Sequence, residues 1–242
     1  MKAVGIFYTD NRKMPGKLAL RCWDQAVWAA QENGVDMVYV GQQPRPAEWG
    51  YLPVAEVVVK PAPGTHFQQR IYEAILAGLA AAPAAEMVYL VEHDVLYPAE
   101  HFGLHESPEL DGQWLGYDCT CARLTPAGYL AHAQPLLSCL VGYRTMIHTQ
   151  LSGRLAFLRS GGRWTWSELG RAGRGAGDYK CVVRAGAPVL DLRWGGNVTG
   201  MRKGEAVPTW DGWGDFRQVW AEKAGVPMSA LPTPARGCQG AP

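Results

Sequence analysis

Short apolar runs alternate with helix-like segments over the first hundred residues of the chain. Each apolar run has the length of a buried strand, and the runs cover residues 3–8, 37–40, 54–59 and 87–91. Apolar positions at helical spacing lie between the first two runs, at Leu20, Trp23, Val27 and Ala30, before the helix stop Asn33-Gly34. This alternation predicts an α/β fold with a mostly parallel, Rossmann-like sheet flanked by helices.

A second helix is predicted between the third and fourth apolar runs. The segment Pro61-Ala62-Pro63-Gly64 ends the third strand, and Thr65 with Gln68 has the spacing of a capping box. One apolar face of this helix is then formed by Ile71, Ile75, Gly78 and Leu79. The result is a strand–helix–strand unit that ends in the fourth run.

The pattern is weaker beyond residue 110. We predict a strand over 114–122, a helix over 135–148 and a last strand over 189–194. The whole of 1–225 is expected to form a single domain, whereas the Pro-, Gly- and Ala-rich segment 226–242 is typical of a disordered tail.

Polar tripeptides follow two of the predicted parallel strands, at the sheet edge where such folds bind ligands. They are Thr9-Asp10-Asn11 and Glu92-His93-Asp94. Two carboxylates one residue apart on a strand point the same way, and carboxylate oxygens suit Mg²⁺ or Mn²⁺. By spacing alone, Asp94 is equally consistent with a turn cap and Glu92 with a partner for an arginine.

Composition indicates an ordinary soluble protein, with 48% hydrophobic and 19% charged residues among 242. No apolar run reaches the roughly 18 to 20 residues that cross a bilayer, and no cleavage site follows the first strand. We therefore expect a cytoplasmic protein without a membrane segment. The six cysteines lack zinc-site spacing and are expected to be buried free thiols.

Charge is unevenly distributed although the net charge is only +1. Residues 151–184 contain seven Lys and Arg against two acidic residues, which gives +5 there and leaves −4 elsewhere. Aromatic residues are interleaved with these bases, at Phe157, Trp164, Trp166 and Tyr179. The pattern is found on surfaces that contact nucleic-acid phosphates, and also on solvated loops with ordinary surface arginines.

Six short segments together carry a resemblance to a known family. In order they are YTDNR at 8–12, ILAGL at 75–79, VEHDVLYPAEHF at 91–102, YDC at 117–119, GYR at 142–144 and DLRWGGNVTGMRK at 191–203. Over roughly residues 3–203 the chain resembles GT-A nucleotide-sugar glycosyltransferases, in particular small bacterial and bacteriophage proteins with a Glu-His-Asp metal motif. This group includes phage enzymes, encoded beside TET-type dioxygenases, that attach sugars to 5-hydroxymethylcytosine in DNA.

The resemblance implies a metal-dependent hexosyl- or N-acetylhexosaminyltransferase. It would use a UDP-sugar and Mn²⁺ or Mg²⁺, and the favoured acceptor is 5-hydroxymethylcytosine in DNA, in the host cytoplasm if the chain is phage-encoded. A saccharide, lipid-linked sugar or protein acceptor is an alternative. So is a non-catalytic nucleic-acid-binding module on the same fold.

The resemblance also implies roles for individual residues. Asp94 becomes the direct metal ligand, Glu92 a partner of the metal through water, and His93 lies on the other side of the strand. Residues expected to bind the donor are Tyr8, Thr9, Asp10, Asn11, Gln68, Gln69, Lys180, Arg193, Arg202 and Lys203. Asp178, after a glycine-rich segment, is the expected general base. Residues expected to contact DNA are Arg154, Arg159, Arg163, Trp164, Trp166, Arg171 and Arg174.

One position departs from the family pattern. Relatives often have Arg-His-Gly near the last strand, where the histidine completes the metal site, but this chain has Arg193-Trp194-Gly195. The metal then keeps an extra water, another histidine substitutes, or metal dependence is weakened. His93, His101 and His105 offer substitutes, although polar histidines on a turn or short helix are the commoner interpretation.

Overall fold

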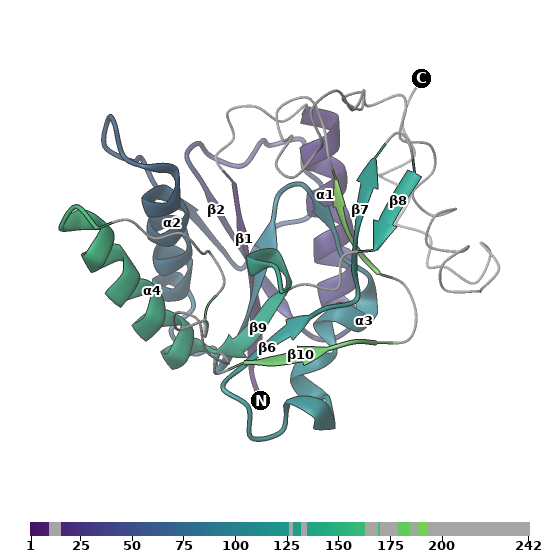
Figure 1. Ribbon diagram of the computed structural model, residues 1–242. Helices are drawn as coiled ribbons and strands as arrows, with labels where there is room; N and C mark the ends of the chain where they lie inside the picture. The colour runs from purple at the N-terminus through teal and green to yellow at the C-terminus, as the bar shows by residue number, and fades with distance from the viewer. Residues whose placement is uncertain are drawn as a thin grey trace.

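The computed structural model describes residues 1–9, 16–125, 128–131, 135–162, 169, 179–184 and 188–192. A seven-stranded sheet forms the centre of the molecule, with helices on both faces (Figure 1). This confirms the predicted α/β class with a mostly parallel sheet. The predicted tail at 226–242 lies outside the described residues.

The large sheet has the strand order β10-β6-β9-β4-β1-β2-β3. Its strands are β1 (Ala3–Tyr8), β2 (Asp36–Gly41), β3 (Ala55–Val58), β4 (Met87–Glu92), β6 (Leu115–Asp118), β9 (Leu140–Tyr143) and β10 (Lys180–Val182). A smaller sheet has the order β5-β11-β7-β8, with β5 (Val95–Leu96), β11 (Val189–Leu192), β7 (Cys121–Thr125) and β8 (Gly128–Ala131).

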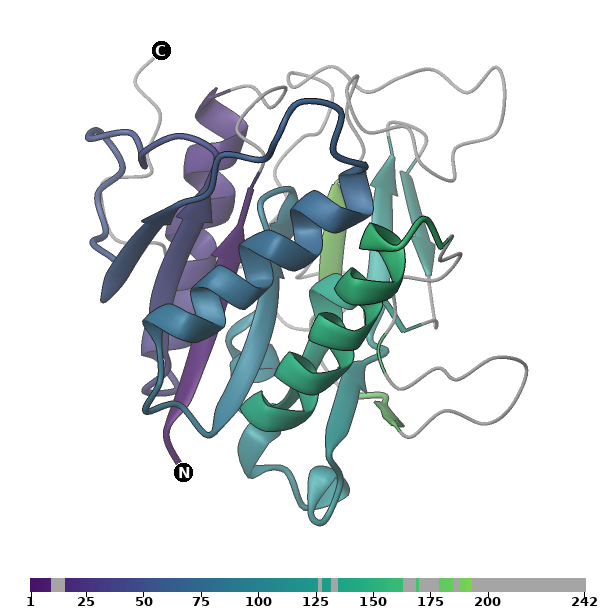
Figure 2. The same cartoon turned by 90° about the vertical axis from the view of Figure 1, so that its left-hand side faces the viewer.

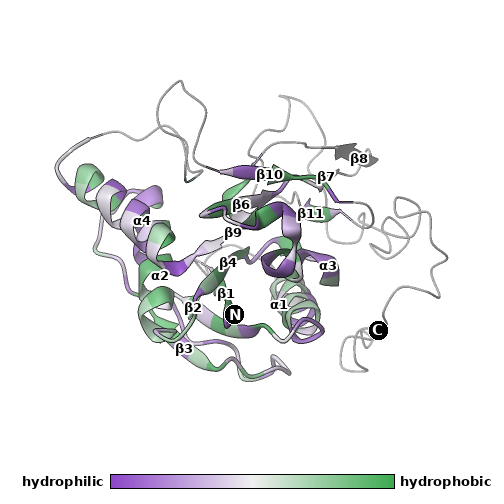
Figure 3. Cartoon of the chain, turned by 90° about the horizontal axis from the view of Figure 1, so that it is seen from below, coloured by the Kyte–Doolittle hydropathy of each residue, from purple (hydrophilic) through white to green (hydrophobic). Residues whose placement is uncertain are grey.

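Two long helices cover one face of the large sheet, and α1 covers the other (Figure 3). The pair on one face is α2 (Phe67–Ala81) and α4 (Arg144–Arg159), which lie side by side (Figure 2). On the other face α1 (Gly16–Gln31) packs near the short α3 (Ala99–Phe102). Three 3₁₀ turns complete the described chain, at η1 (Leu104–Glu106), η2 (Pro108–Leu110) and η3 (Leu137–Cys139). No helix of the described residues is long and apolar enough to cross a membrane.

The register of the central strands brings their carboxyl ends together. β1 pairs in parallel with both β4 and β2, so Tyr8 lies beside Glu92 on one side and Val40 on the other. The first and fourth apolar runs therefore end at the same edge of the sheet, where the sequence placed the tripeptides that follow them; Asp10 and Asn11 lie outside the described residues. In parallel sheets this edge is where ligands bind.

The predicted helix over 135–148 is wrong. Leu140–Tyr143 forms strand β9, which runs antiparallel between β4 and β6, and the helix begins only at Arg144. A short apolar run of this kind has no periodicity that separates a buried strand from a helix. The predicted strand over 114–122 is also divided, because the chain leaves the large sheet after Asp118 and enters the small sheet at Cys121.

The start of α2 also differs from the prediction. The N-cap is His66, whose Nδ1 accepts a hydrogen bond from the Gln68 backbone N–H at 3.3 Å. Thr65 instead donates its hydroxyl to the carbonyl oxygen of Ala62 at 2.7 Å. Thr65 thus stabilises the proline-rich turn, and His66, the next residue, caps the helix.

The prediction that all six cysteines are free thiols is wrong for one pair. Cys119 and Cys181 form a disulfide, whereas Cys22, Cys121 and Cys139 are free and buried. The two bonded residues are 62 apart in sequence, and the parallel pairing of β10 with β6 brings their Cα atoms to 5.8 Å. Sequence spacing contains no signal for such a contact.

Candidate functional site

A pocket of about 150 Å³ lies at the carboxyl ends of β1, β2 and β4, beside the first two turns of α2. Its apolar wall consists of Val59, Pro61, Phe67, Ile71 and Ala74. Its polar wall consists of Tyr8, Thr9, Gly41, Gln42, Arg70, Glu92 and His93. The volume is below the roughly 300 to 1,000 Å³ of pockets for drug-sized ligands, so the pocket can hold a small group or one part of a larger ligand.

Tyr8 lies close to both carboxylates of the site. Its ring is 4% exposed, and burial raises the pKa of its phenol well above the ordinary value. The nearby negative charges of Glu92 and Asp94 raise this pKa further. Tyr8 is consequently a neutral hydroxyl at physiological pH, close to both acidic side chains.

The tripeptide Glu92-His93-Asp94 is not extended as the sequence predicted. β4 ends at Glu92, and His93 and Asp94 form the turn that leads to β5. The alternation of side chains therefore stops, and both Glu92 and His93 line the pocket. Asp94 is 5% exposed. The pKa of the Cys22 thiol on α1 is raised mainly by burial and secondly by the negative charge of Asp94, so Asp94 lies near that helix.

Two carboxylates stand at the end of β4, of which Glu92 lines the pocket and Asp94 does not. Mg²⁺ is commonly held by one or two carboxylates together with waters and substrate phosphates. Both Glu92 and Asp94 act on the pKa of the same phenol at Tyr8, so their charges are concentrated at one end of β4. Among the described residues, however, no three His, Cys, Asp or Glu side chains gather as a metal site.

Two of the histidines considered as substitute ligands belong to the core. His101 is fully buried, and its Nδ1 lies 2.9 Å from Oδ2 of Asp118. His105 lies with Nδ1 2.9 Å from the hydroxyl of Tyr89 and 3.0 Å from the carbonyl oxygen of Phe102. Neither belongs to a metal-binding group within the described residues. His101 lies on the short helix α3 and His105 on the 3₁₀ turn η1, as the commoner interpretation expected.

The first turns of α2 contribute a residue that the sequence prediction missed. Gln68 is buried and Gln69 is half-buried, and neither lines the pocket. The lining residues of this helix are instead Phe67, Arg70, Ile71 and Ala74, which follow the i, i+3, i+4, i+7 spacing of one helix face. That spacing was present in the sequence, and Arg70 is the cation it places at the pocket.

Only part of the remaining prediction falls on described residues. Lys180 is exposed on β10. Donor-site and catalytic predictions outside the described residues are Asp10, Asn11, Asp178, Arg193, Arg202 and Lys203. The same holds for the predicted DNA contacts Arg163, Trp164, Trp166, Arg171 and Arg174.

The two predicted DNA contacts that are described lie on α4. Arg154 is 6% exposed, because it shares the buried face of α4 with Leu151, Leu155 and Leu158. It therefore does not contribute to an exposed basic surface. Arg159 is exposed, and its Nη2 forms an ion pair with Oε1 of Glu73 at 2.8 Å.

Comparison with known proteins yields only distant structural likeness. No family model and no curated protein matches the chain. A glycosyltransferase involved in the glycosylation of the major capsid of PBCV-1 is similar at 7% identity and a TM-score of 0.39, over 65% of this chain and 66% of that one.

Two further solved structures have similar scores. A protein described as a nucleotide-diphospho-sugar transferase, from Desulfovibrio desulfuricans, has 12% identity and a TM-score of 0.40, over 84% of this chain and 90% of that one. Core-mannan synthase A from Aspergillus fumigatus, in a Mn/GDP form, has 11% identity and a TM-score of 0.39, over 68% and 67%. Values this low carry no argument about function.

Proposed function

We propose that this chain is a metal-dependent glycosyltransferase that moves a sugar from a nucleotide sugar, specifically a UDP-sugar, to a hydroxyl acceptor. The observation that carries the proposal is the pocket at the carboxyl edge of the sheet, where Tyr8, Thr9 and Glu92 meet. The sequence resemblance assigns Tyr8 and Thr9 to binding of the nucleotide sugar and Glu92 to the metal site.

The walls of the pocket suit a nucleotide base. Phe67 and Ile71 offer an apolar surface against which a flat ring can lie, while Gln42 and Thr9 offer hydrogen-bonding groups. The small volume favours a pyrimidine over a purine. Arg70 adds a cation whose planar donors match a phosphate or a carbonyl oxygen.

The acidic end of β4 suits the leaving diphosphate. A Mg²⁺ or Mn²⁺ ion held by Asp94, Glu92, waters and donor phosphates would supply positive charge to that leaving group. Tyr8 keeps its proton and can donate a hydrogen bond to an oxygen in the site. In the proposal Lys180 contacts the diphosphate and Asp178 takes the proton from the acceptor hydroxyl.

The proposed acceptor is 5-hydroxymethylcytosine in DNA, and its support comes from the sequence. The resemblance includes phage enzymes with this acceptor, and the +5 charge of residues 151–184 is suited to phosphate contacts. Because Arg154 is buried, Arg159 is paired with Glu73 and Arg184 is paired with Asp118, the other bases of the segment would have to make those contacts.

A nucleoside analysis by mass spectrometry tests donor, acceptor and metal site together. The protein is incubated with Mn²⁺, a panel of UDP-sugars and DNA that contains 5-hydroxymethylcytosine. We expect a hexose or N-acetylhexosamine mass gain on the modified cytosine, which is lost in Asp94→Ala. The matched control is Asp111→Ala, which removes an exposed carboxylate on a turn after η2.

The other outcomes separate the alternatives. Release of UDP without a mass gain on DNA would keep the transferase and exclude this acceptor, in favour of a saccharide, lipid-linked or protein hydroxyl. Absence of both signals, with DNA binding retained in Asp94→Ala, would replace the proposal by a nucleic-acid-binding module.

A further inference from the structure

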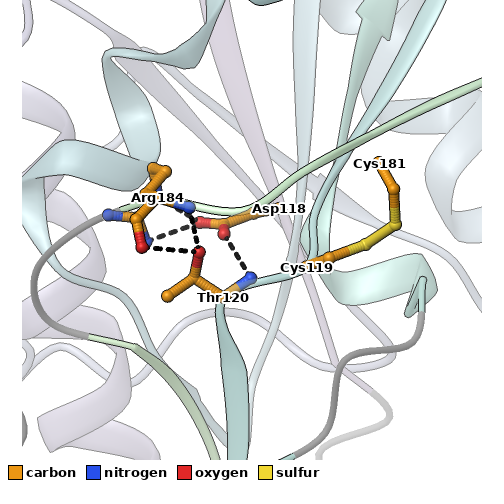
Figure 4. Close-up of a disulfide and its surroundings, with 5 residues drawn as sticks. All are labelled: Asp118, Cys119, Thr120, Cys181 and Arg184. Atoms are coloured by element: carbon orange, nitrogen blue, oxygen red, sulfur yellow. Dashed lines mark hydrogen bonds and ion pairs between the residues drawn. A yellow bond between two sulfur atoms is a disulfide. The ribbon is translucent and has the colours of Figure 1, made fainter.

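A disulfide fastens the last strand of the large sheet to its neighbour (Figure 4). Cys119 directly follows β6 and is 4% exposed, whereas Cys181 is the middle residue of β10 and is exposed. One sulfur is therefore packed in the core and the other belongs to a residue at the surface. A thiol in solution would reach the bond from the Cys181 side.

Strand β10 has few other contacts that hold it in place. It has three residues, lies at the end of the sheet order, and pairs with β6 alone among the described strands. Val182 is its one buried residue, and the Val182 carbonyl oxygen accepts a hydrogen bond from the Cys119 backbone N–H at 2.7 Å. Short edge strands with little buried surface are the parts of a fold that open first.

A buried ion pair depends on β10 staying in the sheet. Arg184, two residues beyond β10, donates from Nε and Nη2 to Oδ2 of Asp118 at 2.9 and 2.7 Å. Asp118 is fully buried, and its Oδ1 also accepts from the Thr120 backbone N–H at 2.9 Å. Separation of β10 from β6 would remove Arg184 from this carboxylate and leave His101 as its one ionisable partner among the described residues.

A second pair of cysteines provides an internal comparison. Cys121 and Cys139 are free thiols, 4% and 0% exposed. The pKa of the Cys139 thiol is raised well above its ordinary value, mainly by a hydrogen bond between the two side chains and secondly by burial. Both thiols are shielded from solvent and the Cys139 thiol is poor in thiolate, so this pair reacts more slowly than the pair that includes the exposed Cys181.

We propose that Cys119–Cys181 is a reversible thiol–disulfide exchange site that holds β10 in the sheet when oxidised and releases it when reduced. A dithiol, small or protein-borne, is the co-reactant. One of its thiolates forms a bond to Sγ of Cys181, the S–S bond breaks, and Sγ of Cys119 leaves and takes a proton. The second thiolate then displaces Cys181, so that the dithiol is oxidised to a disulfide while the protein gains two electrons and two protons.

Hydrogen–deuterium exchange on the full chain tests this proposal. The protein is purified without reductant, and its thiols are blocked by alkylation before mass spectrometry to establish which cysteines are bonded. Dithiothreitol is then added at neutral pH. We expect exchange of residues 180–184 to increase at least about 10-fold, with β1 and β4 unchanged, and to return on reoxidation. Alkylation after reduction should label Cys119 and Cys181 well before Cys121 and Cys139.

Two variants make the test specific. Cys119→Ala/Cys181→Ser should show the fast exchange of 180–184 with or without dithiothreitol. Cys139→Ala, which removes a buried thiol outside the pair, should keep the response to reductant. If the double variant does not fold, the reduced wild-type chain still supplies the measurement.

Three results would overturn the proposal. The first is a Cys119–Cys181 pair that is already alkylated in protein purified without reductant. The second is complete reduction with no change at 180–184. The third is loss of protection throughout the molecule on reduction, which would make the bond a static support of the fold. None of these readouts depends on sugar transfer.

Discussion

His101 and Asp118 form a buried titrating pair whose protonation is determined by its surroundings. Burial lowers the pKa of His101 below its ordinary 6.5, and the hydrogen bond and charge of Asp118 only partly oppose this. The neutral ring donates from Nδ1 to Asp118, and its Nε2 has no hydrogen-bond partner among the described residues. An unpaired acceptor nitrogen costs less than an unpaired, charged N–H at the same buried position, which agrees with the neutral form.

We predict that this histidine makes the fold less stable as pH falls below about 6.5. The unfolded chain takes up a proton there that the folded chain does not, so stability is present above the unfolded pKa and lost on acidification. For one group the slope is at most about 1.4 kcal/mol per pH unit. Urea denaturation between pH 5 and 8 measures it, with His101→Gln expected to lack this slope.

The control for this experiment is His148→Gln on α4, because His148 is exposed. It should keep the wild-type slope, and an unchanged slope in His101→Gln would contradict the prediction.

Asp118 affects stability at a lower pH than His101 does. Burial alone would raise the pKa of its carboxyl, but His101 and Arg184 together hold that pKa below 3.8, so its contribution is lost only as pH falls below that value.

Arg70 gives the sharpest residue-level test of the pocket. If its guanidinium binds a donor phosphate or carbonyl oxygen, Arg70→Met should raise KM for the UDP-sugar about 10- to 100-fold, as loss of a hydrogen bond to a charged group does. The value of kcat should change little, because the contact exists before and during transfer. Steady-state UDP release measures both constants.

Arg159→Met serves as the matched control, because it removes an arginine whose ion pair with Glu73 lies away from the pocket lining. Equal effects of the two variants on KM would mean that Arg70 acts through general charge rather than through the pocket.

At the scale of elements, α2 approaches the sheet through a glycine. A Cβ at Gly78 would lie 2.6 Å from Cγ2 of Ile6 and 3.0 Å from Cγ2 of Val40. Both neighbours are buried strand residues that cannot move aside without disturbing the core. We predict that Gly78→Ala destabilises the fold by about 1 to 3 kcal/mol, measured by denaturant unfolding.

Gly153→Ala on α4 is the matched control. This glycine lies in an exposed helical position with no described atom within 4 Å of the added methyl group. It should leave stability unchanged or raise it by about 0.5 to 1 kcal/mol, because alanine favours the helix. A Gly78→Ala variant that behaves the same way would contradict the close approach of α2.

The elements predicted from the sequence were those with a clear hydrophobic period. The four parallel strands at the start of the large sheet and the first two helices were predicted from apolar runs and helical spacing, within a few residues of their ends. β9 was missed because four apolar residues have no period of their own, and its partners β4 and β6 are distant in sequence. Tertiary pairing determined the structure there.

The same distinction applies to the site. The position of Tyr8, Thr9 and Glu92 at the carboxyl edge of the sheet could be predicted, because parallel strands in such folds end at the edge where ligands bind. The burial of Arg154, the Cys119–Cys181 bond and the turn that separates Glu92 from Asp94 could not, because each depends on which distant segment packs against the residue. Arg70 is an intermediate case. The sequence shows that it shares a helix face with Phe67 and Ile71, but it does not show that this face borders a pocket.

At the scale of the whole molecule, charge is divided between a basic segment and a slightly acidic remainder. The chain is +1 overall, with +5 in residues 151–184 and −4 elsewhere. If the chain binds DNA as proposed, a duplex would approach that segment preferentially, because phosphate contacts supply most of the sequence-independent affinity for DNA. Two described bases of the segment are already engaged, Arg159 by Glu73 and Arg184 by Asp118, so the test must use other positions.

We predict that neutralising Arg171 and Arg174, for example to Gln, weakens DNA binding and leaves UDP-sugar hydrolysis unchanged. Loss of two phosphate contacts should reduce the slope of log K against log salt by roughly two, since each contact contributes about 0.9. A matched variant, Lys2→Gln/Lys60→Gln, makes the same change in net charge on exposed residues outside the segment. Binding measured over a salt series separates the two: equal losses in both variants would indicate general charge attraction, and unchanged binding in the arginine variant would remove the segment from the DNA-contacting surface.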